Sequence, residues 1–180
     1  MTVNAFVVWD PSTKEAAIFD SGADASELIA FVQNEGLKVQ GVWVTHTHRD
    51  HIKDIPAIVR AFDCPIYVGE KELANFGTSF AAGEKFSIGT LTIESKLTWG
   101  HARGGITYVV SGLGKPIAVV GDALFAQSMG GGMISFKDAL ETSGQEIMTL
   151  PDETAICPGH GPMSSVGEEK RVNPFFAGKF

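Results

Sequence analysis

Apolar residues recur along the chain in short runs, some with the spacing of strands and others with the spacing of helices. Runs typical of strands occupy 5–9, 16–19, 39–44, 65–69, 106–111, 117–120 and 154–157, and 86–97 predicts a strand pair that turns at Gly89. Apolar residues spaced three and four apart predict helices at 26–35, 55–62, 136–150 and 167–176. The first two strands, separated by a turn-rich stretch at 10–13, predict an opening hairpin.

Strands and helices alternate in two similar halves, without repeats, low-complexity tracts or linker-like stretches. At 180 residues the chain is long enough to bury a sizeable core, so we expect one domain over 1–180. The pattern alone indicates a mixed α and β fold. Two sheets with helices packed outside them would bury its apolar faces.

Composition narrows the function classes. With 44% hydrophobic and 19% charged residues, the chain has the usage of a globular protein. A net charge of −7 disfavours nucleic acid as a partner. The N-terminus lacks the features of a signal peptide, no run is long enough to span a membrane, and Cys64 and Cys157 fit a reducing compartment. We therefore expect a cytoplasmic protein that acts on a small molecule, with no membrane partner; the oligomeric state is left open.

The residues with the strongest chemical signal follow the strand at 39–44. His46 and His48 are two apart at the end of that strand, so in extended backbone their side chains point to the same side. Asp50 and His51 follow where the strand gives way to a helix. Imidazole and carboxylate groups bind zinc, iron and related metals, so these four residues predict the nucleus of a metal site.

Three more candidate ligands each follow a predicted strand. They are His101 after Trp99-Gly100, Asp122 after Val120-Gly121, and His160 within Pro158-Gly159-His160-Gly161. Strand ends that meet at one sheet edge can bring distant residues together. All five histidines of the chain belong to this pattern, which makes coincidence a poor explanation.

In this order the motifs resemble those of metallo-β-lactamase-fold hydrolases. The matching stretches are His46-Thr47-His48-Arg49-Asp50-His51, Gly100-His101, Gly121-Asp122 and Pro158-Gly159-His160-Gly161. Gly121-Asp122-Ala123-Leu124-Phe125 and the closing Asn173-Pro174-Phe175 are most similar to a short glyoxalase II-like branch. The resemblance covers nearly the whole chain and implies a four-layer αββα sandwich.

The resemblance also implies a two-metal site. It places one metal at His46, His48 and His101, and the second at Asp50, His51 and His160, with Asp122 bridging both. Two zinc ions are expected, with iron or manganese as alternatives at either position. Asp50 and Asp122 would be the catalytic carboxylates, because they hold the metals that share a hydroxide, the nucleophile.

The substrate is less constrained than the metal site. Glyoxalase II enzymes hydrolyse S-acylglutathione thioesters, and thioester hydrolysis is our leading interpretation. The chain ends soon after Pro174, without the extra helical region that forms part of the glutathione surface in those enzymes, and 127–135 lacks their usual Gly-Arg-Thr-Asp-like run. Recognition of glutathione therefore stays open.

Two other functions share the motif. Persulfide dioxygenases hold one iron with residues that match His46 or His48, His101 and Asp122. A lactonase or β-lactamase-like hydrolase is the further alternative, although the missing export signal weighs against degradation of antibiotics. A nuclease or a non-enzymatic binding module fits less well, because the chain is acidic and keeps all seven candidate ligands.

Four other features are weaker signals. Asp20 is expected to support the metal site from beneath, with a simple turn residue as the alternative. Arg49 and Lys53 could attract an anionic substrate, or are ordinary exposed residues at a helix start. The loop from Met129 to Met133 could form an adaptable acyl pocket. Cys157 is expected to be a small buried apolar residue rather than part of the site.

Overall fold

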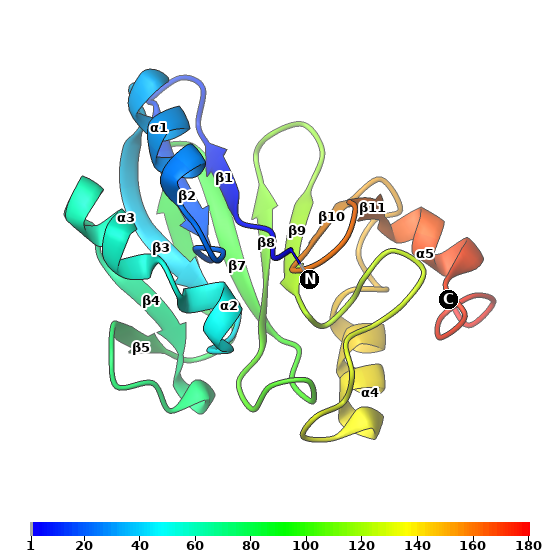
Figure 1. Cartoon of the computed structure of the whole chain (residues 1–180). Coiled ribbons are helices and arrows are strands. Elements are labelled where there is room, and N and C mark those ends of the chain that lie inside the picture. The colour runs from blue at the N-terminus through cyan, green and yellow to red at the C-terminus, as the bar shows by residue number, and fades with distance from the viewer. Residues whose placement is uncertain (1) are drawn as a thin grey trace.

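The computed structural model describes residues 2–180 and contains two β-sheets with helices outside them (Figure 1). Its first half contains β1 (Phe6–Trp9), β2 (Glu15–Phe19), α1 (Ser26–Asn34), β3 (Lys38–Val44), α2 (Arg49–Ile52), α3 (Ile55–Phe62), β4 (Ile66–Gly69), the 3-10 helix η1 (Glu70–Glu72) and β5 (Thr78–Phe80). Its second half contains β6 (Lys85–Ile88), β7 (Leu91–Leu97), β8 (Ile106–Ser111), β9 (Ile117–Gly121), α4 (Phe136–Glu146), β10 (Ala155–Pro158), β11 (Ser164–Ser165) and α5 (Val166–Val172).

The strands form one sheet from each half of the chain. The first sheet has five strands in the order β1-β2-β3-β4-β5, and the second has six in the order β11-β10-β9-β8-β7-β6. The predicted opening hairpin is confirmed, because β1 and β2 pair antiparallel; β2, β3, β4 and β5 then pair in parallel. The predicted pair around Gly89 is β6 and β7, and Gly89 has a positive φ of 55°. Parallel pairing of β9 with β10 brings the ends of two ligand-bearing strands to the same edge.

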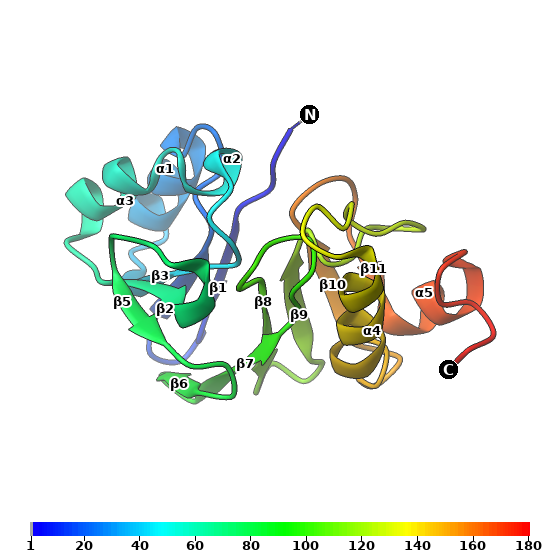
Figure 2. The same cartoon turned by 90° about the horizontal axis from the view of Figure 1, so that it is seen from below.

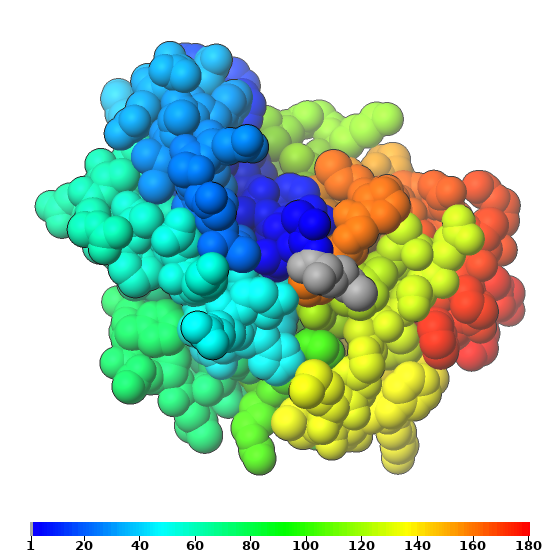
Figure 3. Space-filling model, viewed as in Figure 1, coloured from blue at the N-terminus to red at the C-terminus, as the bar shows by residue number. Residues whose placement is uncertain are grey.

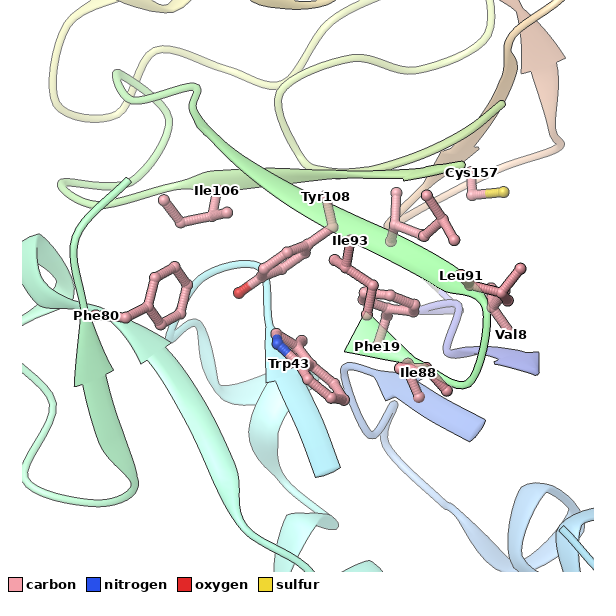
Figure 4. Close-up of a cluster of buried hydrophobic side chains, with 13 residues drawn as sticks. Val8, Phe19, Trp43, Phe80, Ile88, Leu91, Ile93, Ile106, Tyr108 and Cys157 are labelled. Atoms are coloured by element: carbon pink, nitrogen blue, oxygen red, sulfur yellow. The ribbon is translucent and has the colours of Figure 1, made fainter. Parts of the chain in front are cut away.

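The main core lies between the two sheets (Figure 4). Aromatic rings dominate it: Phe19 packs against Trp43 and Tyr108 at centroid separations of 6.1 and 5.3 Å. Tyr108 is completely buried, and its hydroxyl donates a hydrogen bond of 2.7 Å to the carbonyl of Val44. This bond satisfies the buried hydroxyl and fixes the end of β3, just before the histidine cluster.

Helices cover the outer face of each sheet, as Figure 2 shows. Ile18, Val42 and Ile58 belong to the apolar cluster between the first sheet and its helices. Ile156 and Phe176 belong to the cluster that packs under α4 and α5 on the second sheet. The four-layer αββα sandwich is therefore confirmed. No helix within residues 2–180 is long and apolar enough to span a membrane.

Two predicted helices end earlier than expected. The helix predicted to reach Leu150 ends at Glu146, and the following Ile147 is buried in an irregular turn. The apolar spacing continued there because these side chains enter the core, although the backbone is no longer helical. The helix predicted to reach 176 ends at Val172, because Asn173 is extended ahead of a proline.

The pattern did not predict β5 and β11. They are three and two residues long, and Phe80 is their only buried residue. Strands this short contain too few alternating positions to give a periodic signal. The remaining predicted elements are present, with bounds that differ by a residue or two.

Candidate metal centre

The candidate ligands all follow strands, and the two sheets bring these strand ends together. His46 and His48 follow β3, and Asp50 and His51 lie in α2. The remaining three follow β7, β9 and β10: His101, Asp122 and His160. Their nitrogen and oxygen atoms form three overlapping groups, each with all its ligand atoms within 4.8 Å of one another. The structure therefore brings all seven predicted residues into one cluster.

The first group consists of His46, His48 and His101. The Nδ1 atom of His48 lies 3.0 Å from Nε2 of His46 and 3.0 Å from Nε2 of His101. Burial, together with the neighbouring histidines, lowers the pKa of His46 well below its ordinary value. Burial and the nearby His101 also lower the pKa of His48. Low pKa values keep these rings neutral, which is the form that binds metals.

The second group consists of Asp50, His51 and His160. Nε2 of His160 lies 3.2 Å from Oδ2 of Asp50, whose side chain is 45% exposed, whereas His51 is fully buried. This group therefore extends from the interior to the surface. A site that is open on one side leaves room for water and substrate, as catalytic metal sites do.

Asp122 lies between the two groups. Its Oδ1 is 3.3 Å from Nε2 of His51, and its Oδ2 is 3.4 Å from Nε2 of His101 and 3.5 Å from Nε2 of His160. Burial raises the pKa of Asp122, but the facing histidines, His51 above all, outweigh burial and lower it. One ionised carboxylate therefore reaches nitrogens from both groups, which is the position that the resemblance implied for a bridging ligand.

The cluster fits metal ions better than a network of hydrogen bonds. Ligands of one tetrahedral zinc, each at about 2.0–2.2 Å, lie about 3.4 Å apart, close to the separations of Asp122 from the three histidines. Nε2 of His51 and Oδ1 of Asp122 are completely buried and face each other at 3.3 Å without hydrogen-bond geometry, and neither has another hydrogen-bond partner among residues 2–180. Buried polar atoms rarely lack partners, so these two atoms fit a site that binds a cation. The imidazole and carboxylate set is compatible with a dinuclear site, and suits zinc, iron or manganese.

Asp20 supports the site from beneath, as the sequence suggested. Its Oδ2 accepts a hydrogen bond of 2.8 Å from Nδ1 of His51, and another of 2.7 Å from the hydroxyl of Thr45. Its Oδ1 accepts a third, of 2.8 Å, from the backbone nitrogen of Thr45. With Nδ1 carrying the proton, Nε2 of His51 keeps its lone pair for a metal.

Three more histidines have their Nδ1 atoms in hydrogen bonds. The Nδ1 of His101 donates to the carbonyl of Gly131 at 2.8 Å, and that of His160 to the carbonyl of Thr2 at 2.9 Å. Nδ1 of His46 lies 3.1 Å from the hydroxyl of Thr45. The partners of His101 and His160 could not be predicted, because a backbone carbonyl is present at every position and leaves no signal in a sequence.

Protons and metals compete for His51. Burial lowers its pKa, but the facing carboxylates of Asp122 and Asp20 outweigh burial and raise it to about 10. Metal binding at Nε2 must release this proton, so acid should weaken binding.

Two glycines let the backbone approach the cluster. A Cβ atom at Gly159 would lie 2.2 Å from Oδ1 of Asp122 and 2.5 Å from Cε1 of His51. A Cβ atom at Gly130 would lie 1.8 Å from the carbonyl oxygen of Asp122. Any side chain at either position would displace Asp122, so glycine is required at both.

The weaker sequence signals have different outcomes. Cys157 is buried in the core between the sheets, where burial raises the pKa of its thiol to about 12, so its predicted apolar role is confirmed. Met129 packs into the core beneath α4 and α5, whereas Met133 is 70% exposed, and an acyl pocket at this loop stays a prediction. Arg49 is exposed, which fits either reading of its role.

The N-terminal segment borders the site. Val3 forms an isolated antiparallel bridge with His160, and the backbone nitrogen of Asn4 donates to the carbonyl of Gly159 at 2.7 Å. On the face shown in Figure 3, the blue N-terminal segment adjoins the orange segment after β10, and the cyan segment with α2 lies beside them. Segments from the two ends of the chain therefore surround one part of the surface.

Known proteins share this fold. A family model for the metallo-β-lactamase superfamily matches residues 1–160. The probable metallo-hydrolase M6_Spy0554 of Streptococcus pyogenes serotype M6 is 28% identical over 187 residues, covering 88% of this chain and 80% of that protein.

Two solved structures are similar over almost the whole chain. BLEG-1, a B3 metallo-β-lactamase, has a TM-score of 0.87 at 28% identity and covers 99% of both chains. ETHE1 from Myxococcus xanthus has a TM-score of 0.86 at 25% identity and covers 99% of this chain and 81% of that one. Since the family model matches most of the chain and the relatives include metallo-hydrolases, this chain belongs to the metallo-β-lactamase superfamily and is a metallo-hydrolase of that family.

Proposed function

We propose that this chain hydrolyses a small-molecule thioester of the S-acylglutathione class, with a site for two metal ions. The observation that carries the proposal is the position of Asp122, whose carboxylate lies within 3.5 Å of His51, His101 and His160. A carboxylate shared in this way supports two metals. When bound, two such ions would lower the pKa of a bound water and polarise the substrate carbonyl.

The side chains of the site have separate tasks in this reaction. His51 and Asp122 are buried and hold their ligand atoms rigidly, while Asp50 is half-exposed at the side from which substrate can enter. Asp20 fixes the ring of His51 through its Nδ1. Rigid ligands reduce the reorganisation that the transition state requires.

The ease with which a thiolate leaves favours a thioester as the substrate. A thiol has a pKa of about 8.5, so a thiolate can depart without receiving a proton, whereas an amine or an alkoxide requires a general acid. The carboxylates and histidines of the cluster face one another as candidate ligands, and we assign none of them as a general acid. The motif at Gly121-Asp122-Ala123-Leu124-Phe125, which resembles glyoxalase II-like hydrolases, supports the same substrate class.

Two alternatives have specific support. The similarity to BLEG-1 over 99% of both chains supports a β-lactam or a related ring, such as a lactone, as substrate. The mononuclear-iron persulfide dioxygenase would use His46 or His48, His101 and Asp122; His46, His48 and His101 have ligand atoms within 4.8 Å of one another, and Oδ2 of Asp122 lies 3.4 Å from Nε2 of His101, which supports this alternative. Each alternative predicts a different product or metal content.

Metal content and a substrate screen test the proposal together. The chain is purified without added metal, its zinc, iron and manganese are measured, and S-acylglutathione, β-lactam, lactone and glutathione persulfide are assayed in parallel. We expect two metals per chain and release of thiol from the thioester. One iron per chain with oxygen uptake on the persulfide would refute the hydrolase, and selective opening of a β-lactam or lactone would refute the thioester.

Substitution of Asp122 tests the bridging role. We expect Asp122→Ala to lose at least one metal and nearly all hydrolysis while its circular dichroism spectrum is unchanged. Asp152→Ala is the matched control, because the side chain of Asp152 is 71% exposed and lies outside the cluster. Full metal content and turnover in the Asp122 variant would contradict a bridging carboxylate.

A further inference from the structure

Glu72, outside the predicted ligand set, joins two of the segments that carry ligands. Its Oε2 accepts hydrogen bonds from the backbone nitrogen of Thr47 at 2.7 Å and from the hydroxyl of Thr47 at 2.5 Å. Its Oε1 accepts a hydrogen bond of 2.6 Å from the backbone nitrogen of Gly104. Thr47 lies between His46 and His48, and Gly104 closely follows His101. One carboxylate thus holds both segments of the first ligand group.

The packing around Glu72 is tight on the side of Gly104. A Cβ atom at Gly104 would lie 2.4 Å from the backbone nitrogen of Glu72 and 2.7 Å from the carbonyl carbon of Lys71. Since no side chain fits there, the backbone of the segment after His101 lies directly against η1. This contact brings the amide of Gly104 within reach of the carboxylate.

The charge of Glu72 has no cationic partner. All three donors to its carboxylate are uncharged, and within residues 2–180 it forms no salt bridge with a lysine, arginine or histidine. Hydrogen bonds to an ionised carboxylate are stronger than those between neutral groups, so Glu72 can hold the two segments firmly together as a clamp. The negative charge also favours a cation bound at the neighbouring His48.

We propose that Glu72 is a positioning residue for the metal bound by His46, His48 and His101. The carboxylate fixes two segments from different strands, and the ring nitrogens of His48 and His101 then lie 3.0 Å apart. Glu72 forms its hydrogen bonds with Thr47 and Gly104 and none with Asp50 or His160 of the second group within residues 2–180. The inference rests on the proposed metal function, but it concerns one metal only.

The test is Glu72→Gln, measured by cobalt(II) titration of the metal-free chain with a competing chelator. Glutamine keeps the size of the side chain but removes its charge, and its amide NH2 group would face a donor from Thr47 or Gly104. We expect about 10- to 100-fold weaker binding of one metal, with unchanged binding of the other. Glu70→Gln is the matched control, because Glu70 lies in the same turn, is exposed and loses the same charge.

Thr47 provides a second variant that keeps the carboxylate. Thr47→Val removes one of the three hydrogen bonds and should weaken the same metal to a smaller extent, while Thr47→Ser, which keeps the hydroxyl, should restore it. Equal affinities for Glu72→Gln and Glu70→Gln would overturn the inference. Equal weakening of both metals with a lower Tm of the metal-free chain would also overturn it, because that indicates a merely structural role. A wild-type chain that binds no metal would refute the proposed function as well.

Discussion

Substitution of Asp20 by asparagine tests how the fold prepares His51 for a metal. Asp20 has a positive φ of 58°, which asparagine also adopts readily, so the backbone should tolerate the change. The variant keeps an oxygen for the backbone nitrogen of Thr45 but places an amide donor near the hydroxyl of Thr45 and Nδ1 of His51. The hydroxyl can rotate and accept, but His51 can accept only if its proton moves to Nε2.

This shift of the proton removes the lone pair that a metal requires. Nε2 of His51 faces Oδ1 of Asp122 at 3.3 Å, and a proton there would be stabilised by that carboxylate. Substitution of such an outer partner typically weakens metal affinity about 10- to 100-fold, which is about 1.4–2.7 kcal/mol. Loss of a hydrogen bond to a buried charge costs about 1.5–3 kcal/mol of folding stability, so we expect the Tm of the metal-free chain to fall by about 3–12 °C.

The assay is a titration of the metal-free chain with metal and a competing chelator, with Tm followed by circular dichroism. Asp63→Asn is a close control, because Asp63 is exposed, also has a positive φ, of 46°, and loses the same charge. We expect wild-type affinity and Tm in that control. Wild-type affinity in Asp20→Asn would refute the role of Asp20 in fixing the proton of His51.

Two further predictions concern Gly159 and the thiols. Gly159→Ala should lose metal, because its Cβ would lie 2.2 Å from Oδ1 of Asp122. Gly131→Ala is the control and should keep its metal, because no atom lies within 4 Å of a Cβ at that position. Equal metal content of the two variants by mass spectrometry would contradict the steric reasoning. Burial raises the pKa of Cys157 from 9.0 to about 12 and also raises that of Cys64. Both thiols should therefore resist Ellman's reagent at pH 8 in the native chain and react with it in urea. As pH rises, the thiol of Cys157 ionises in the unfolded chain before it ionises in the folded chain, so the stability that its burial contributes should be lost between pH 9 and pH 12. Rapid reaction of either native thiol would contradict the burial.

Some features of the site and fold could be predicted because they depend on nearby residues, and others could not because they depend on distant ones. His46, His48, Asp50 and His51 could be recognised because four metal-binding residue types lie within one short segment after a strand. The other candidates could be added because each follows a strand, and strand ends gather at a sheet edge. The end of α4 and the two shortest strands could not be predicted, because packing and pairing with distant residues set them, whereas the end of α5 follows from the proline after Asn173.

The sequence by itself determined the order and chemistry of the seven candidate ligands and a mixed α and β pattern, because these depend on residue type and local periodicity. The four-layer sandwich was implied by the resemblance of the motifs. Only the tertiary structure decided which groups besides Asp20 orient those ligands. Thr2 and Gly131 contribute backbone carbonyls, and Glu72 is an isolated carboxylate whose partners, Thr47 and Gly104, are 25 and 32 residues away. Such contacts require the chain to fold first, since a hydrogen bond between distant residues depends on their positions in space and leaves no spacing in the sequence.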